Sequence, residues 1–335
     1  MIITRAPLRT SFVGGGTDIK EFYSHYPGRV ISTSINKFVY IVSHSGYSDH
    51  FIMKYSKTEM VKNISEIKHT LFREALSKVN ISKGIEIASF SDLSSGSGLG
   101  SSSSFSVALM KALYANKGKK ISKEEAAQAA CELEIDILKE PIGKQDQYAA
   151  AYGGFNVITF NTDGTVSVEP VYIDFKFRSK LEDHMMLFFT GITRSASSVL
   201  CKQKKNINDK FEIYKEMSDS VLVFRDKLFA QDLRGIADML NDGWKIKKSL
   251  ASCISNDEID TLYETAIKAK AWGGKILGAG AGGCLLFIAD PKLQPKIQKE
   301  LEKKAKKLKL VNFKRIHFSL TSSGVDILFN SSNIQ

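Results

Sequence analysis

Hydrophobic and polar positions divide the 335-residue chain into segments with two different periods. Alternating or β-branched runs are typical of strands, and apolar residues at every third or fourth position are typical of helices. The first pattern predicts strands at 30–42, 85–88, 155–160, 166–173, 184–190 and 284–289. The second predicts helices at 65–79, 102–114 and 122–139, and a largely helical region at 205–270.

This mixture of strands and helices predicts an α+β protein with two lobes. Neither a repeat, nor a low-complexity tract, nor a long flexible linker marks the division between them in the sequence. We place the division near residue 180, which gives an N-terminal domain at 1–180 and a C-terminal domain at 181–335.

The helix at 122–139 has the clearest start of these elements. Ser122 and Glu125 have the spacing of a capping box, in which a hydroxyl and a carboxylate each accept a free backbone N–H of the first turn. Pro141 and Gly143 follow the helix and are expected to end it.

The chain carries 47 basic and 36 acidic residues, a formal net charge of +11. Much of the excess lies between Lys292 and Lys309, where Ile297, Leu301, Ala305 and Leu308 recur at helical spacing among lysines. This pattern is typical of a surface helix with a solvated basic face. The charge favours anionic ligands through electrostatic steering. Since no nucleic-acid-binding motif accompanies it, we expect no nucleic-acid partner.

The sequence also bears on the compartment. The longest apolar stretches are far shorter than the ~20 residues that a membrane-spanning helix needs, and the N-terminal segment lacks the apolar core of a signal peptide. The four cysteines are scattered, without a C-x-x-C pair. We therefore expect a cytoplasmic protein with reduced thiols and no membrane partner.

Candidate chemistry begins with the segment Ser95–Ser104, which reads SGSGLGSSSS and lies between a predicted strand and a predicted helix. Glycines let successive N–H groups point at one anion, and the helix that follows adds its free amides and the positive end of its dipole. A flexible linker is the alternative, but Leu99 and the immediate helix start favour an ordered turn. The spacing matches neither a Walker A loop nor a dinucleotide-binding fingerprint.

Two further glycine-rich segments are less specific. The segment 278–283, GAGAGG, precedes an apolar strand and fits a tight packing turn as well as a ligand loop. Near the N-terminus, a strand carries Arg9 into a glycine turn, and Asp18 follows the turn. Helix capping is the alternative role for Asp18.

Two acidic residues are candidates for chemistry. Asp146 follows the Pro141–Gly143 break and precedes an apolar run, which suits either a catalytic base or an ordinary capping or ion-pairing residue. Glu134 lies at the edge of the buried stripe of the preceding helix, and the pattern alone favours an exposed, paired acid there.

The three glycine-rich segments, in this order, resemble the motifs of the GHMP kinases, which include galactokinase, homoserine kinase, mevalonate kinase and phosphomevalonate kinase. The matching residues are Ala6-Pro7-Leu8-Arg9, Gly98-Leu99-Gly100-Ser101-Ser102 and Gly278–Gly283. Within that family, the motifs most resemble those of the D-glycero-D-manno-heptose 7-phosphate kinases. The residues that carry this finer resemblance are Arg5–Arg9, Gly14–Asp18, Gly28–Thr33 and Thr190–Ala196. The resemblance spans essentially the whole chain.

This resemblance implies a two-lobed fold, with an N-terminal lobe like domain 2 of ribosomal protein S5 and a ferredoxin-like C-terminal α/β lobe. It implies an ATP- and Mg²⁺-dependent sugar kinase that phosphorylates the anomeric hydroxyl of heptose 7-phosphate to the 1,7-bisphosphate, for surface polysaccharide synthesis. Sugar phosphate and ATP are then the expected partners, and a homodimer stays open. The alternatives are a fucokinase- or galactokinase-like enzyme and a non-catalytic ATP-binding regulator. A galactokinase is disfavoured because Gly15 and Gly16 stand where galactokinases carry Glu-His.

The resemblance also implies residue roles. Asp146 matches the catalytic base and Arg9 the basic residue that faces it, while Glu134 and Ser102 match the Mg²⁺ ligands. The residues expected to bind the ATP phosphates are Gly96, Gly98, Leu99, Gly100, Ser101, Ser102 and Ser103.

Substrate binding is assigned to Asp18, which matches the sugar-contacting aspartate of the family, with the neighbouring turn and the C-terminal loop. A phosphate on the sugar needs a basic residue, for which a guanidinium is well suited. The residues expected to contact the substrate are Gly15, Gly16, Thr17, Asp18, Arg29, Arg194 and Gly280.

Overall fold

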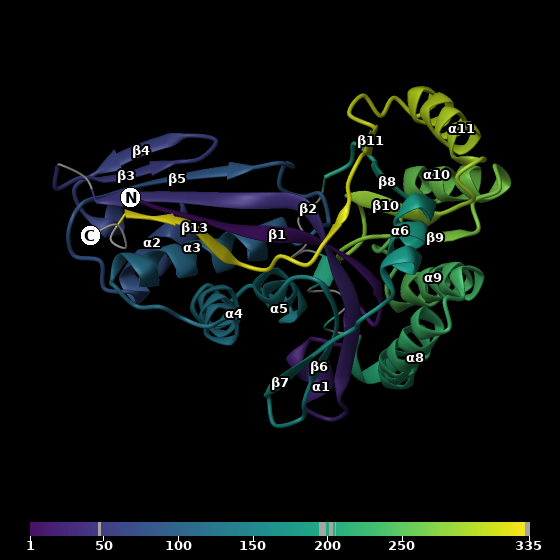
Figure 1. Ribbon diagram of the computed structural model, residues 1–335, viewed down its shortest axis with the longest axis horizontal. Helices are drawn as coiled ribbons and strands as arrows, with labels where there is room; N and C mark the ends of the chain where they lie inside the picture. The colour runs from purple at the N-terminus through teal and green to yellow at the C-terminus, as the bar shows by residue number, and fades with distance from the viewer. Residues whose placement is uncertain (46–47, 194–198, 201–203, 205, 332–335) are drawn as a thin grey trace.

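The computed structural model describes residues 1–45, 48–193, 199, 200, 204 and 206–331, and these form two lobes, each built on its own β-sheet (Figure 1). The strands are β1 Ile2–Val13, β2 Gly28–Ser45, β3 Phe51–Lys54, β4 Thr58–Val61, β5 Ile85–Ser91, β6 Phe155–Phe160, β7 Val166–Pro170, β8 Met185–Phe189, β9 Gly273–Ile276, β10 Cys284–Ile288, β11 Lys314–Ile316, β12 Leu320–Thr321 and β13 Asp326–Asn330. The helices are α1 Lys20–Tyr23, α2 Thr70–Lys78, α3 Ser101–Asn116, α4 Lys123–Cys131, α5 Gln145–Tyr152, α6 Phe175–His184, α8 Phe211–Phe229, α9 Leu233–Leu250, α10 Asp257–Lys268 and α11 Gln294–Lys307.

The sheet of the N-terminal lobe is organised around the long strand β2. Its path is β13-β1-β2-β5-β3-β4, and other parts of β2 pair with β6 and β12. The pairings are antiparallel except for β3 with β5. Helices α2, α3, α4 and α5 lie along one face of this sheet (Figure 1). Strands β12 and β13 come from the region assigned by sequence to the second domain, so the chain returns to its first sheet before it ends.

The second lobe has a four-stranded antiparallel sheet in the order β11-β8-β10-β9. Its hydrophobic cluster includes Phe188, Phe287 and Trp244 from both strands and helices. A separate cluster joins the lobes, because Leu8 and Phe12 of β1 pack with Leu187 of β8 and Leu240 of α9. The second half of β1 therefore runs between the lobes, and this position carries Arg9 into the interior.

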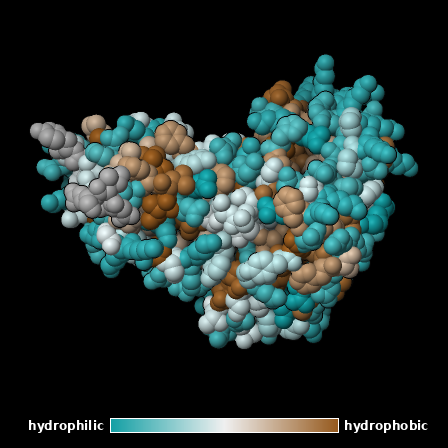
Figure 2. Space-filling model, viewed as in Figure 1, coloured by the Kyte–Doolittle hydropathy of each residue, from teal (hydrophilic) through white to brown (hydrophobic). Residues whose placement is uncertain are grey.

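The local predictions for helices are confirmed in two places. Ser122 and Glu125 form the expected capping box, with the Glu125 N–H donating to Ser122 Oγ at 3.1 Å and the Ser122 N–H donating to Glu125 Oε2 at 2.6 Å. Helix α11 buries Ile297, Leu301 and Ala305, whereas Leu308 directly follows the helix and is only partly buried. Figure 2 shows mainly hydrophilic side chains around this helix, at the upper right.

Two helices differ from the prediction. The one expected at 65–79 begins only at Thr70, as α2. The helix expected at 122–139 is α-helical only to Cys131 and continues as a π-helical turn, Glu132–Ile137 (η2). A π-turn inserts a residue and changes which side chains face inward. Glu134, which the sequence pattern alone would expose, is 2% exposed in this turn. None of the described helices combines the length and apolar character that a bilayer crossing requires.

Candidate active site

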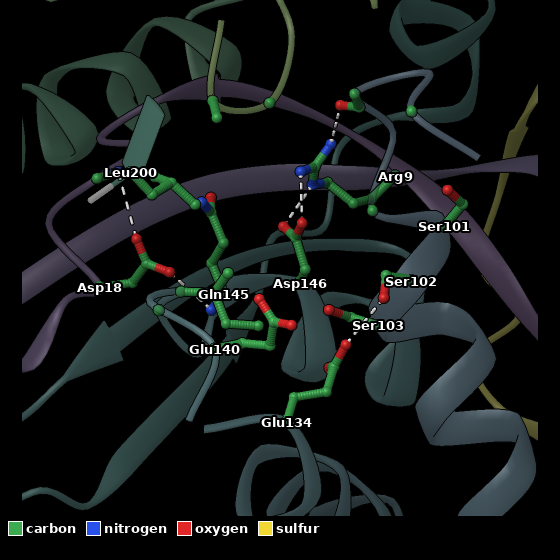
Figure 3. Close-up of a pocket in the computed structure, with 18 of the residues that line it drawn as sticks. Arg9, Asp18, Ser101, Ser102, Ser103, Glu134, Glu140, Gln145, Asp146 and Leu200 are labelled. Atoms are coloured by element: carbon green, nitrogen blue, oxygen red, sulfur yellow. Dashed lines mark hydrogen bonds and ion pairs between the residues drawn. The ribbon is translucent and has the colours of Figure 1, made fainter. Parts of the chain in front are cut away.

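A cavity of about 380 Å³ opens between the two lobes. The N-terminal lobe contributes residues of the 95–104 loop, Arg9, Asp18, Glu134 and Asp146 to its wall. The C-terminal lobe contributes Lys247, Gly278 and Ala279. Figure 3 shows side chains from these separate segments converging on one space.

The Ser95–Ser104 loop is the ordered turn that the sequence predicts. Gly96, Gly98 and Gly100 all have left-handed backbone angles, with φ of 77°, 75° and 77°. Helix α3 begins at Ser101 directly after Gly100, so its first free N–H groups face the cavity wall that Ser101, Ser102 and Ser103 line. This geometry suits an anion, because backbone donors and the helix dipole converge there.

The two glycine loops touch each other at Gly98 and Gly278. A Cβ atom on Gly98 would lie 2.6 Å from the carbonyl oxygen of Leu277, and one on Gly278 would lie 2.9 Å from the Cα of Gly98. Both positions also have positive φ, which glycine adopts without strain. The contact therefore requires glycine on each side and joins the 95–104 loop to the C-terminal lobe.

Arg9 and Asp146 form a two-point ion pair at the cavity wall. Arg9 Nε donates to Asp146 Oδ1 at 2.8 Å, and Arg9 Nη2 donates to Asp146 Oδ2 at 2.7 Å. Arg9 Nη1 donates to the carbonyl of Gly98 at 2.7 Å. The Arg9 side chain is 2% exposed and that of Asp146 is 25% exposed, so Asp146 is the open member of the pair. Two-point pairs of this kind fix the orientation of a carboxylate.

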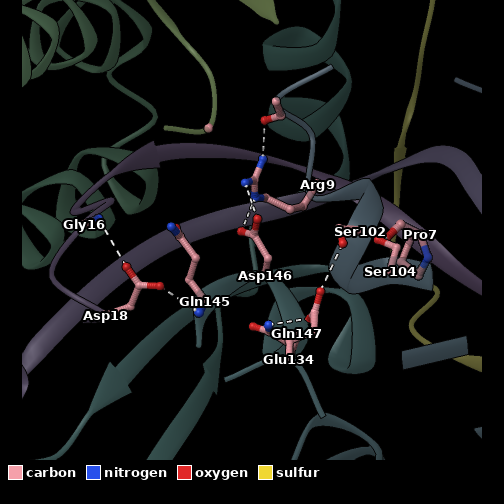
Figure 4. A network of polar contacts seen from close by, with 12 residues as sticks. Pro7, Arg9, Gly16, Asp18, Ser102, Ser104, Glu134, Gln145, Asp146 and Gln147 are labelled. Atoms are coloured by element: carbon pink, nitrogen blue, oxygen red, sulfur yellow. Dashed lines mark hydrogen bonds and ion pairs between the residues drawn. The ribbon is translucent and has the colours of Figure 1, made fainter. Parts of the chain in front are cut away.

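Glu134 lies below the start of α3, as Figure 4 shows. Its Oε1 accepts a hydrogen bond from Ser102 Oγ at 3.1 Å, and its Oε2 accepts one from Gln147 Nε2 at 2.7 Å. Burial raises the pKa of the Glu134 carboxyl to about 7, against the opposing effect of hydrogen bonds from Gln147, Ser103 and Ser102. A cation bound at this carboxylate would stabilise its negative charge in place of the water that burial removes.

Asp18 is held by backbone N–H groups on the other side of the cavity. Its Oδ1 accepts from the Gly16 N–H at 3.3 Å, and its Oδ2 accepts from the Gln145 N–H at 3.0 Å. Burial is the largest influence on this carboxyl and raises its pKa to about 6. Figure 4 shows that Asp18 and Asp146 face the space from different elements, with Gln145 between them.

Comparison with known proteins identifies this arrangement. Residues 48–154 match the N-terminal domain of the GHMP kinases, and residues 224–307 match their C-terminal domain. The chain is also 32% identical over 323 residues to the D-glycero-alpha-D-manno-heptose 7-phosphate kinase of Campylobacter jejuni, an alignment that covers 90% of this chain and 93% of that protein. The chain belongs to the GHMP kinase family. This GHMP kinase is an ATP-dependent small-molecule kinase, as its motifs predict.

Solved structures agree on the fold of the GHMP kinase. A D-glycero-D-manno-heptose 1-phosphate kinase from Bacteroides thetaiotaomicron superposes with a TM-score of 0.81 at 23% identity, covering 98% of this chain and 99% of that one. Lactococcus lactis galactokinase, solved with galactose, superposes with a TM-score of 0.77 at 16% identity, covering 98% of this chain and 95% of that one. The two-lobed α+β fold expected from the sequence is thus confirmed.

The structure places several predicted residues of the GHMP kinase behind the cavity wall. Leu99 is fully buried in the core between the lobes, and its carbonyl accepts the Arg9 N–H at 3.0 Å. Thr17 is also buried, and its hydroxyl donates to the carbonyls of Gly14 and Arg29 at 2.9 and 2.8 Å. Gly15 is absent from the described cavity lining, whereas Gly16 is part of it. These neighbours support the loop and the glycine turn.

Arg29, one of the two predicted basic residues, is not part of the described cavity lining. The Arg29 guanidinium pairs with Asp219 at 3.2 Å on the surface, and Arg194 lies outside the described residues. Gly280 packs against the chain instead, since a Cβ there would lie 2.5 Å from the carbonyl oxygen of Ile254. Its glycine is explained by this close approach.

Lys247 is among the cavity residues of the GHMP kinase that sequence reasoning missed, and it brings a positive charge from the C-terminal lobe. It is 7% exposed and donates from Nζ to the carbonyl of Gly278 at 2.5 Å. The signal was present, because the buried stripe of α9 places Lys247 three residues after Trp244 and seven after Leu240. A lysine within an apolar stripe is unusual unless it has a partner.

Proposed function

We propose that this kinase transfers the γ-phosphoryl group of ATP to the anomeric hydroxyl of D-glycero-D-manno-heptose 7-phosphate, giving the 1,7-bisphosphate. The observation that carries the transfer step is the Arg9–Asp146 pair, which faces the cavity beside the glycine loop. The choice of sugar is supported by the relative at 32% identity, which is a heptose 7-phosphate kinase.

In this proposal Asp146 acts as the general base. The anomeric oxygen forms a bond to the γ-phosphorus as the bond to the β,γ-bridging oxygen breaks, so ADP leaves and the hydroxyl proton passes to Asp146. Arg9 holds the carboxylate in place and adds positive charge near the transferred group. The N–H groups of the 95–104 loop bind the phosphate oxygens.

The residues at Glu134 fit Mg²⁺. A hard cation prefers oxygen ligands and keeps several waters, so one carboxylate, one hydroxyl and the ATP phosphates suffice. Glu134 Oε1 and Ser102 Oγ, 3.1 Å apart, are the protein oxygens that would hold it. When bound, the ion would neutralise phosphate charge during transfer.

A panel of sugars tests the substrate. ADP release should be fastest with heptose 7-phosphate and much slower with heptose 1-phosphate, unphosphorylated heptose, fucose and galactose. Turnover of fucose or galactose without turnover of any heptose phosphate would reject the proposed sugar. ATP binding without ADP release from any member of the panel would instead favour a regulator that has lost the transfer step.

A substitution near Asp18 tests its assignment to the sugar. A methyl group on Gly143 would lie 2.0 Å from Asp18 Oδ2, so Gly143→Ala must displace this carboxylate. We expect the KM for the sugar to rise about tenfold or more, a loss of about 1.4 kcal/mol or more of binding free energy, while the KM for ATP changes little.

The control for this substitution is Gly243→Ala on α9, where a methyl group would meet Val13 Cγ1 at an ordinary 3.8 Å. Equal changes in the KM values for sugar and ATP in Gly143→Ala would show that Asp18 has no special role toward the sugar.

A further inference from the structure

The starting observation is a buried ammonium group that the proposed mechanism does not use. Lys247 belongs to the last turn of α9 in the C-terminal lobe, and its side chain lines the cavity. Lys275 is similarly buried, but it donates to the carbonyl of Phe12 at 2.7 Å and is not part of the described cavity lining. Of these two lysines, Lys247 is therefore the one that can reach a ligand.

Contacts between the glycine loops place Lys247 close to the transfer site. Its Nζ donates to the carbonyl of Gly278, and Gly278 packs directly on Gly98. On the other side of that contact, Arg9 Nη1 donates to the carbonyl of Gly98. The two cations thus flank the junction of the loops, one from each lobe.

The Lys247 ammonium has hydrogen-bonding capacity to spare. Within the described residues, the Gly278 carbonyl is the hydrogen-bond acceptor that Lys247 reaches, which leaves two of its three N–H donors available. Burial, and next the positive charge of Arg9, lower the pKa of Lys247 to about 8. The carboxylates of Asp18 and Asp146 act in the opposite direction. A phosphate bound beside the free N–H donors would add a direct anionic partner for the buried ammonium.

We infer that the Lys247 ammonium is a catalytic group that binds the transferred phosphoryl group opposite Arg9, so that one cation from each lobe stabilises the charge that develops there. The inference rests on the proposed transfer site. The phosphate that heptose 7-phosphate already carries is a second conceivable ligand. It lies at the opposite end of the sugar from the reacting hydroxyl, whereas Lys247 is linked through the loop junction to Arg9 and Asp146.

The test replaces Lys247 with methionine, which keeps the length of the chain and removes its charge. We expect kcat to fall about 10²–10³-fold, the effect of losing one preorganised donor to transition-state charge. The matched control is Lys245→Met on the same helix, because Lys245 is exposed and pairs with Asp242 at 3.0 Å. This control should retain normal kcat.

A second measurement separates charge stabilisation from a structural role. Tetrafluoroaluminate with ADP, Mg²⁺ and sugar mimics the transferring phosphoryl group. Addition of tetrafluoroaluminate should make the unmodified protein and Lys245→Met bind ADP more tightly. Lys247→Met should bind ADP alone with normal affinity. The increase in ADP affinity caused by tetrafluoroaluminate should be at least tenfold smaller in this variant.

Three results would overturn the inference. A kcat within threefold of normal in Lys247→Met is the first. The second is a parallel loss of ADP affinity and melting temperature, which would assign Lys247 only to support of the Gly278 loop. The third is a raised KM for the phosphorylated sugar alone, with kcat retained, which would assign it to the substrate phosphate. The assay uses whichever sugar the unmodified protein turns over, so an error in the proposed sugar leaves this comparison intact.

Discussion

Replacing Asp146 with asparagine should reduce kcat by about 10²–10⁴-fold, the range expected for loss of a general base. An amide has nearly the same shape but cannot accept the hydroxyl proton. It also presents an N–H group toward Arg9 where Asp146 offers two oxygens, at 2.8 and 2.7 Å from the guanidinium. ADP release at saturating ATP and sugar measures the effect.

A measurement of ATP binding distinguishes loss of the catalytic base from disruption of the ATP site. The 95–104 loop holds the phosphates in the proposal, so calorimetry should give an ATP dissociation constant within about threefold of normal for Asp146→Asn. Asp136→Asn, at an exposed position of the π-turn Glu132–Ile137, should behave like the unmodified protein. Near-normal turnover of Asp146→Asn would remove this residue from the mechanism.

The second large effect is expected for Glu134→Gln, which keeps the shape of the side chain and removes its charge. If Glu134 holds Mg²⁺ with Ser102, kcat should fall at least 10²-fold, and raising the Mg²⁺ concentration should restore little of it. Glu132→Gln is the control, since Glu132 belongs to the same π-turn but is exposed and pairs with Lys78.

The same substitution that lowers the activity should favour the stability of the folded protein as the pH rises. Because burial raises the pKa of Glu134 to about 7 from an ordinary value of 4.5, the folded protein binds more protons than the unfolded chain between these values. Its contribution to stability is therefore present at low pH and is lost as the pH rises toward 7. The glutamine variant has no such loss.

We expect the melting temperature of Glu134→Gln to increase relative to that of the unmodified protein as the pH rises from about 4.5 to 7. Without Mg²⁺, this relative increase should persist above pH 7. Mg²⁺ with a nucleotide should stabilise the unmodified protein more than the variant, because only the former keeps the carboxylate. Thermal melts at pH 5 and pH 8 measure both effects. A pH-independent difference would show that Glu134 does not titrate in this range.

Local features of this protein were readable from its sequence because neighbours along the chain determine them. The capping box at Ser122 and the buried stripe of α11 follow from spacing alone. The ordered 95–104 turn needs glycine at Gly96, Gly98 and Gly100, and the sequence supplies it. The order of the three glycine-rich motifs then indicated a GHMP kinase, and the matched domains confirm that prediction.

Other features depended on residues far apart in the sequence. Gly98 and Gly278 are both glycines because each fills the space where the other would need a side chain. The π-turn directs Glu134 inward, and strand β13 returns to pair with β1. Lys247 reaches the cavity only because α9 packs on the strand that carries Arg9. Spacing along a chain reports which residues share a face, but only folding decides which faces meet and which charges must lie together without water.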